Sequence, residues 1–189
     1  MDTLSHALWG YAVTRWRGPR TARWGAVMGA APDLLYSSAA LIDRISRKGL
    51  SALNERGGAD PSIWRRDGPP LPEELVYAYN TYYVWTHSLI ILAAVALIWY
   101  LLRRRPPWLL LPWLVHILMD IPTHERYETP FLFPLSDFKI IGYSWGRPAI
   151  LIANLTALAL VYFLLYRRYW SKHRAAREQP WPEEAGGIV

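Results

Sequence analysis

Long apolar runs separated by polar segments dominate the pattern of this chain. The runs 84–102 and 148–166 each hold 19 residues without a formal charge, and the run 24–42 holds a single charge, Asp33. A membrane-spanning helix needs about 20 mostly apolar residues. The pattern therefore predicts membrane spans at these three places.

Two shorter apolar runs, 108–121 and 3–16, predict further helical segments, which either span the membrane fully or are buried or partly inserted. We therefore expect an all-α fold, a multi-pass membrane bundle with about four to five helical segments in or on the membrane. Residues 1–166 would form the membrane domain, and the end of the chain, 167–189, a basic tail.

The positions of the basic residues predict how the chain crosses the membrane. Twelve of the 21 Lys and Arg residues lie in the short segments 15–23, 103–105 and 167–177. The other two connections, 43–83 and 122–147, hold nine basic and nine acidic residues. Because Arg-rich segments stay on the cytoplasmic side, we expect five crossings, an outer N-terminus, a cytoplasmic tail and two outer loops, 43–83 and 122–147.

Composition narrows the chemistry that this bundle can perform. The chain of 189 residues is 52% apolar and has no cysteine, which excludes thiolate ligands and thiol nucleophiles. Its net charge of +6 raises the alternative of a soluble protein that binds nucleic acid. The basic residues lie at the ends of apolar runs and not on one face of a soluble element, so we expect a lipid bilayer as partner and no nucleic acid.

Several ionisable residues lie in or beside the apolar runs, where they are costly and therefore point to a function. With a rise of 1.5 Å per residue, Asp33, His116 and Asp120 lie about 14, 12 and 18 Å from the cytoplasmic ends of their runs, and His87 and His6 about 22 and 15 Å. Separate segments thus send imidazole or carboxylate groups to one level in the middle to outer part of the membrane. The candidate site residues are His6, Asp33, His87, His116, Asp120 and His124.

The sharpest local pattern is His116-x-x-x-Asp120, which places both side chains on one helical face. Imidazole and carboxylate are ordinary ligands of zinc and similar divalent ions. Pro122 favours an end of the helix at Ile121, with His124 reaching in from the turn. A plain hydrogen-bonded pair, or a proton relay of buried His and Asp residues, remains the alternative.

The order of five short motifs resembles a known family. MDTLSHALWG, GAAPD, THSL, HILMDIPTH and FLFPLSD follow one another over roughly residues 1–147. This resembles the bacterial membrane-bound metal-dependent hydrolases, the family of domain of unknown function 457, which includes a LexA-regulated inner-membrane hydrolase. The resemblance implies a location in the bacterial inner membrane and hydrolysis of a small-molecule or lipid substrate.

The ligand order is also similar to that of zinc-dependent phospholipase C, which implies a role for each residue. Asp33, His87, His116 and Asp120 would hold one zinc ion, and Asp120 would bridge to a second ion shared with His6, with His124 as a further ligand. An N-terminal Trp ligand and a downstream H-x-x-x-E are missing, so one or two ions are expected.

The resulting hypothesis is a hydrolase of phosphoesters or phospholipid head groups. Metal-activated water would be the nucleophile, with Asp33 or Asp120 accepting its proton. Lys139 and Arg147 are either phosphate contacts or ordinary interfacial charges. The alternative is a membrane adaptor or transporter with a structural metal or a His/Asp proton relay.

Overall fold

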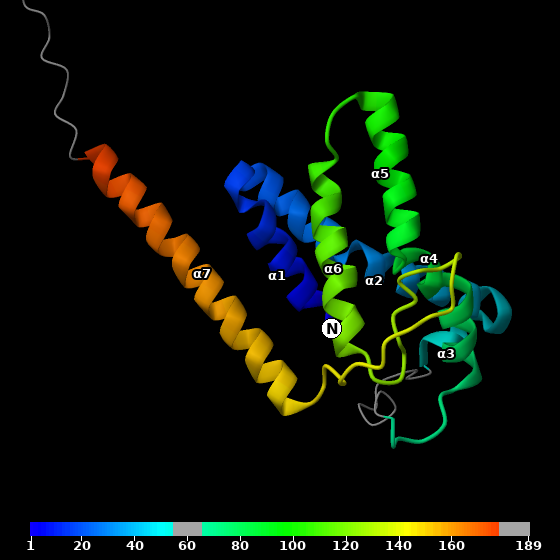
Figure 1. The fold of residues 1–189 in the computed structure, drawn as a ribbon. Coiled ribbons are helices and arrows are strands. Elements are labelled where there is room, and N and C mark those ends of the chain that lie inside the picture. The colour runs from blue at the N-terminus through cyan, green and yellow to red at the C-terminus, as the bar shows by residue number, and fades with distance from the viewer. Residues whose placement is uncertain (55–65, 178–189) are drawn as a thin grey trace, which may run out of the picture.

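Helices make up the regular structure of the chain (Figure 1). The computed structural model describes residues 1–54 and 66–177, the side chains of 52–54 and 172–177 excepted, and these ranges contain no strand. The expected all-α fold is thus confirmed. The α-helices are α1 (Thr3–Thr14), α2 (Pro19–Lys48), α3 (Glu73–Ala78), α4 (Val84–Thr86), α5 (Leu89–Arg103), α6 (Leu111–Thr123) and α7 (Pro148–Arg177). The 3₁₀ turns η1 (Arg15–Arg17), η2 (Gly49–Asn54) and η5 (Trp108–Leu110) and a π-helical turn, η4 (Tyr79–Tyr83), join them.

Three helical stretches are long and apolar enough to cross a membrane. They cover Pro19–Ser51, Glu73–Arg103 and Pro148–Ser171, and Trp108–Thr123 is a shorter apolar helix. Many of their apolar side chains point outward, as lipid contact requires. For example, Leu97 on α5 is 57% exposed and Ile152 on α7 is 62% exposed. The fold is therefore compatible with the multi-pass membrane protein that the sequence predicts.

Helices α1 and α2 cross with their backbones in contact. A Cβ atom at Gly10 would lie 2.2 Å from the carbonyl oxygen of Gly25, and one at Gly29 would lie 2.3 Å from the carbonyl oxygen of His6. Gly25 and Gly29 form a G-x-x-x-G pattern, which allows membrane helices to approach closely because neither residue has a side chain. The crossing holds His6 of α1 against the part of α2 that leads to Asp33.

Two prolines lie inside helices and do not end them. Helix α2 continues through Pro32, and α6 continues through Pro122 to Thr123, two residues beyond the end expected at Ile121. The last carbonyl groups of a helix have no partner within it. Here the carbonyl oxygen of Pro122 accepts a hydrogen bond from the backbone N–H of Tyr143 at 2.9 Å, which supports the last turn of α6 from outside.

Helical structure also reaches into the segments that the sequence suggests are connections. Helix α2 runs past residue 42 to Lys48, and α3 and η4 occupy the end of the 43–83 segment. Helix α7 continues beyond residue 166 to Arg177. Residues 55–65 and 178–189 of these two segments lie outside the described residues.

Polar contacts attach α7 to α1. The side chain of Asn154 accepts a hydrogen bond from Trp9 Nε1 at 2.9 Å and donates one to Ser5 Oγ at 2.8 Å. The hydroxyl of Tyr162 donates to the carbonyl oxygen of Leu8 at 3.0 Å. Such contacts join helices in an apolar environment, where apolar packing alone gives little preference for protein over lipid.

The three Arg-rich segments lie toward one end of the molecule. In Figure 1 the turn between α1 and α2, the connection between α5 and α6 and the C-terminal end of α7 are in the upper part of the view, whereas 124–147 is in the lower part. This arrangement is the one that the predicted topology requires, and the topology itself stays a prediction.

Candidate metal centre

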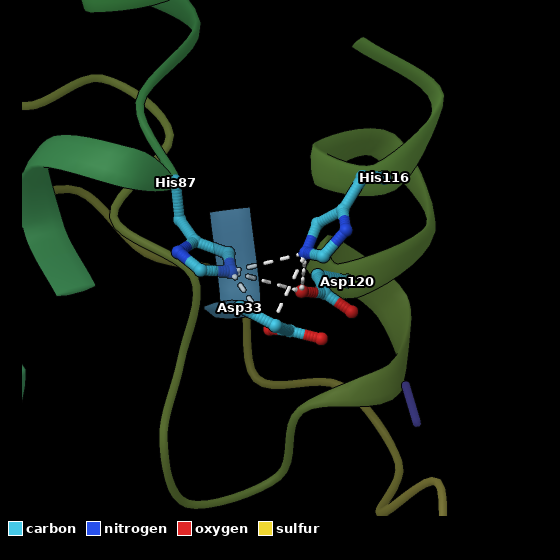
Figure 2. Close-up of side chains that lie close together, drawn as sticks. All are labelled: Asp33, His87, His116 and Asp120. Atoms are coloured by element: carbon cyan, nitrogen blue, oxygen red, sulfur yellow. Dashed lines mark hydrogen bonds and ion pairs between the residues drawn. The ribbon is translucent and has the colours of Figure 1, made fainter. Parts of the chain in front are cut away.

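Four of the six predicted site residues meet at one point in the bundle. Asp33, His87, His116 and Asp120 each offer one ligand atom, and these atoms all lie within 4.8 Å of one another. Figure 2 shows the four side chains converging, with His116 and Asp120 from the same helix, α6. His87, His116 and Asp120 are buried, whereas the Asp33 side chain remains 20% exposed.

The candidate ligand atoms lie close to one another. The Nε2 atoms of His87 and His116 lie 3.1 Å apart. Asp120 Oδ2 lies 3.2 Å from His116 Nε2 and 3.5 Å from His87 Nε2. Asp33 Oδ1 lies 3.6 Å and 3.5 Å from the same two nitrogens.

Backbone carbonyl groups determine which ring nitrogen of each histidine faces the centre. His116 Nδ1 donates to the carbonyl oxygen of Gly29 at 2.6 Å. His87 Nδ1 lies 3.2 Å from the carbonyl oxygen of Tyr83 and 2.8 Å from Thr86 Oγ1. Since a carbonyl oxygen can only accept, His116 Nδ1 carries the proton and His116 Nε2 directs a lone pair toward the centre. The contact of His87 Nδ1 with the Tyr83 carbonyl favours the same tautomer for His87. Metal-binding histidines are commonly oriented in this way.

This donor set fits a divalent cation. Two lone pairs at 3.1 Å and two carboxylate groups repel one another unless a positive charge lies among them. Asp120 Oδ2 is buried and has no hydrogen-bond donor within the described part of the chain. Four ligands at about 2.1 Å from a tetrahedral zinc ion would lie about 3.4 Å apart. Distances of 3.1–3.6 Å are of that size, so the four residues could hold such an ion.

A break between two helices presents His87. This residue ends α4, and Ser88 caps the next helix, α5, by accepting hydrogen bonds from the N–H groups of Ile90 and Ile91. The Ser88 hydroxyl itself donates to the carbonyl oxygen of Phe133. Ser88 therefore anchors the 129–138 segment to α5, and its hydroxyl is not directed at the metal centre.

His6 and His124, the other two predicted ligands, lie against the opposite oxygen of Asp120. His6 Nε2 is 3.0 Å from Asp120 Oδ1, and the His6 ring stacks on that of His116 with centroids 3.6 Å apart. His124 Nδ1 is 3.6 Å from Asp120 Oδ1 and bonds to the backbone carbonyl of Asp120 at 3.0 Å. The α-amino group of Met1 donates to the same Oδ1 at 2.5 Å. The six residues are thus neighbours. Asp120 lies between Asp33, His87 and His116 on one side and His6 and His124 on the other.

A cavity of about 600 Å³ opens beside the centre. Asp33 and His124 line it, so Asp33 is the member of the four-residue cluster that reaches the open space. Its other walls include Thr3, Tyr36, Tyr83, Tyr127, Trp145 and Leu151. The cavity thus combines an aromatic and apolar wall with one carboxylate of the candidate site.

The 142–147 segment closes one side of this cavity. The N–H of Gly142 bonds to the carbonyl of His124 at 2.9 Å, and Arg147 donates to Glu125 Oε1 at 2.7 Å. The Arg147 guanidinium holds the pKa of Glu125 below its usual 4.5. Arg147 is therefore paired with an acid, and the Lys139 ammonium lies 5.0 Å from the ring centre of Tyr79. Neither residue lines the cavity, so ordinary surface charge is the better interpretation of both.

Three residues outside the sequence-based list also shape the site. Thr3 Oγ1 donates to Asp33 Oδ2 at 2.8 Å, and the Gly29 carbonyl orients His116. Tyr83 stacks on the His87 ring with centroids 3.6 Å apart. The spacing of Tyr79, Tyr83 and His87 by four residues places them on one helical face and is the signal that would have revealed Tyr83. Thr3 and Gly29 carry no such signal, because their contacts arise only from helix packing.

Comparison with known proteins adds no relative. No protein-family model, no curated protein and no solved structure matches this chain. The resemblance to the membrane-bound metal-dependent hydrolases therefore stays a prediction from the motifs.

Proposed function

We propose that this chain is a membrane-bound, metal-dependent hydrolase that cleaves phosphoesters, with phospholipid head groups as the favoured substrate. The observation that carries the proposal is the pair of His87 and His116 Nε2 atoms, 3.1 Å apart, between the carboxylates of Asp33 and Asp120. A divalent ion in such a site polarises a phosphoryl oxygen and lowers the pKa of a bound water.

The phosphoester class rests on the similarity in ligand order to zinc-dependent phospholipase C. The cavity beside the centre is lined by Asp33 and His124 and by aromatic and apolar side chains. The aromatic and apolar wall suits an amphiphilic substrate that approaches from the bilayer.

The two carboxylates have different surroundings, which suggests different roles. Asp120 is buried, and its Oδ1 is engaged by His6 and the α-amino group of Met1, which suits a ligand held in place. Asp33 lines the cavity, and Thr3 holds its Oδ2. We assign Asp120 as a ligand only, and Asp33 as a ligand through Oδ1 that also accepts a proton from water in the cavity.

The decisive experiment measures the metal content of detergent-purified protein by elemental analysis. We expect one or two zinc equivalents in the wild type and their loss in His116→Ala and Asp120→Ala. His173→Ala and Asp137→Ala remove the same groups elsewhere in the chain and should keep the metal. A folded wild type that holds no metal and cannot be loaded with zinc or manganese would refute the proposal.

A second measurement separates hydrolysis from a structural metal. Zinc-loaded wild type should hydrolyse a phosphodiester such as bis(p-nitrophenyl) phosphate or a phosphatidylglycerol vesicle. Loss of a general base commonly costs about 10²–10⁴-fold in rate, so Asp33→Asn should lose activity on this scale. Bound metal without hydrolysis of any of these substrates would favour the structural-metal alternative.

A further inference from the structure

A second cavity lies at the end of the molecule that carries the Arg-rich segments. Its volume is about 1110 Å³, and its walls come from the start of α2, the end of α5 and the connection through η5 to α6. Arg17, Arg20, Arg103 and Arg105 line it. In Figure 1 these elements lie in the upper part of the view, away from the 124–147 segment beside the metal centre.

The charge of these four arginines is not balanced by described acidic residues. The segments 15–23 and 103–110 contain no Asp or Glu. Arg47 and Arg147 form ion pairs with acidic residues, and neither borders this cavity. Guanidinium groups gathered around one cavity repel one another unless an anion lies among them. The cavity therefore favours an anionic ligand.

Tryptophan rings hold two of the guanidinium groups in place. The guanidinium carbon of Arg17 lies 5.0 Å from the ring centre of Trp16 and 5.0 Å from that of Trp108. That of Arg103 lies 5.8 Å from the ring centre of Trp99. Stacking orders the guanidinium plane and leaves its N–H groups available, which suits recognition of phosphate oxygens.

An apolar groove continues from this cavity. It has a volume of about 430 Å³ and shares Pro106, Pro107, Trp108 and Leu110 with the charged cavity. Its other walls are apolar residues of α5 and α6, among them Leu92, Ala96 and Leu114. A charged cavity joined to an apolar groove matches a molecule with an anionic head and a hydrocarbon chain.

We propose that this cavity and groove bind an anionic phospholipid, with its phosphate among the four arginines and an acyl chain between α5 and α6. The cavity lies where two span-length helices begin or end, which is the level of the lipid head groups. A free phosphate would use the arginines alone and leave the groove empty. The site is separate from the metal centre, since none of the four cluster residues lines it.

The test measures binding of fluorescent phosphatidylglycerol to the detergent-purified full chain by anisotropy, with phosphatidylcholine and inorganic phosphate as competitors. We expect tight binding that phosphatidylcholine and phosphate displace poorly. The pairs Arg17→Gln/Arg20→Gln and Arg103→Gln/Arg105→Gln should each weaken binding roughly 25-fold, from about fivefold per arginine. Arg167→Gln/Arg168→Gln removes the same charge at the end of α7 and should change the affinity less than about twofold.

A groove variant distinguishes a lipid from a free anion. Ala96→Phe narrows the apolar groove without touching the arginines and should weaken phosphatidylglycerol binding while leaving phosphate displacement of a short anionic dye unchanged. The corresponding lysine pair, Arg17→Lys/Arg20→Lys, keeps the charge but loses the stacked guanidinium, so its affinity should lie between those of the glutamine pair and the wild type. This partial recovery guards against a folding defect in the glutamine pairs. Equal competition by phosphate and by lipid, or equal loss in the α7 control, would overturn the proposal.

Discussion

His116 Nδ1 donates a hydrogen bond of 2.6 Å to the backbone carbonyl of Gly29, across the contact between α6 and α2. The same carbonyl belongs to a residue that has no room for a side chain, because a Cβ there would lie 2.3 Å from the carbonyl oxygen of His6. One glycine thus sets both the distance between α1 and α2 and the direction of a candidate metal ligand. Packing and chemistry are coupled at this position.

Replacing Gly29 with alanine should therefore disturb both the contact between α1 and α2 and the orientation of His116. The new methyl group would push α1 from α2, and overpacking of this kind costs about 1–3 kcal/mol. We expect a lower thermal unfolding midpoint together with reduced zinc occupancy. Gly146→Ala is the matched control, because its Cβ would meet nothing closer than Ser144 Oγ at 3.7 Å. If Gly29→Ala has the same thermal unfolding midpoint and the same zinc occupancy as the wild type, the close crossing is not needed for the site.

Removing the hydroxyl that supports Asp33 should weaken metal binding without removing a ligand. Thr3 Oγ1 donates to Asp33 Oδ2 at 2.8 Å, and loss of such a supporting contact commonly costs about 10–100-fold in metal affinity. Thr3→Val should show this loss in a zinc competition titration against a chelator. Thr3→Ser keeps the hydroxyl and should bind nearly as tightly as the wild type, and equal affinity for all three proteins would contradict the assignment.

The Glu125–Arg147 pair should make the 142–147 segment sensitive to acid. Because Arg147 lowers the pKa of Glu125 in the folded state, the folded chain binds this proton more weakly than the unfolded chain. The stabilisation is present above pH 4.5, the usual value, and is lost as the pH falls through the lowered pKa. Its size is small, since the Arg147 side chain is exposed to solvent.

Hydrogen-exchange protection factors of the Ser144 and Trp145 amides measure this effect. In the wild type they should fall on acidification through the lowered pKa of Glu125. Glu125→Gln should show reduced protection already at neutral pH and little further change with acid. An identical pH profile for the two proteins would show that the ion pair does not hold this segment.

Asn154 should matter for the position of α7 and not for metal binding. Asn154→Leu removes the hydrogen bonds to Trp9 and Ser5, and such bonds in membrane bundles contribute about 0.6 kcal/mol each. We expect a modest drop in thermal stability at unchanged zinc content. Thr156→Leu makes a similar polar-to-apolar change at an exposed position of the same helix and should have no effect. Loss of zinc in Asn154→Leu alone would show that α7 supports the centre.

The apolar runs predict the helices well because membrane spans are defined by length and hydropathy, which a sequence displays directly. The convergence of Asp33, His87, His116 and Asp120 follows from the common depth of these residues. The separation of His6 and His124 from this cluster does not follow from their depth, because it depends on the rotation and crossing angle of the helices. The contacts of His116 with the Gly29 carbonyl and of Asp33 with Thr3 depend equally on the α1–α2 crossing.

The ends of helices were harder to predict than their cores. Pro122 suggests an end of α6 at Ile121, but the 142–145 segment supplies a backbone donor that supports the last turn up to Thr123. A partner so far along the chain is invisible to local rules. Arg147, just beyond this segment, donates a hydrogen bond to Glu125 and is therefore unsuited to bind phosphate.

The attachment of α7 has a consequence for the order in which the protein is assembled. All four residues of the candidate metal centre precede α7 in the chain, and α7 joins the bundle through contacts of Asn154 and Tyr162 with α1. During synthesis, all four candidate ligands are therefore present in the chain before α7 is made. The last helix then adds Leu151 to the wall of the cavity beside them.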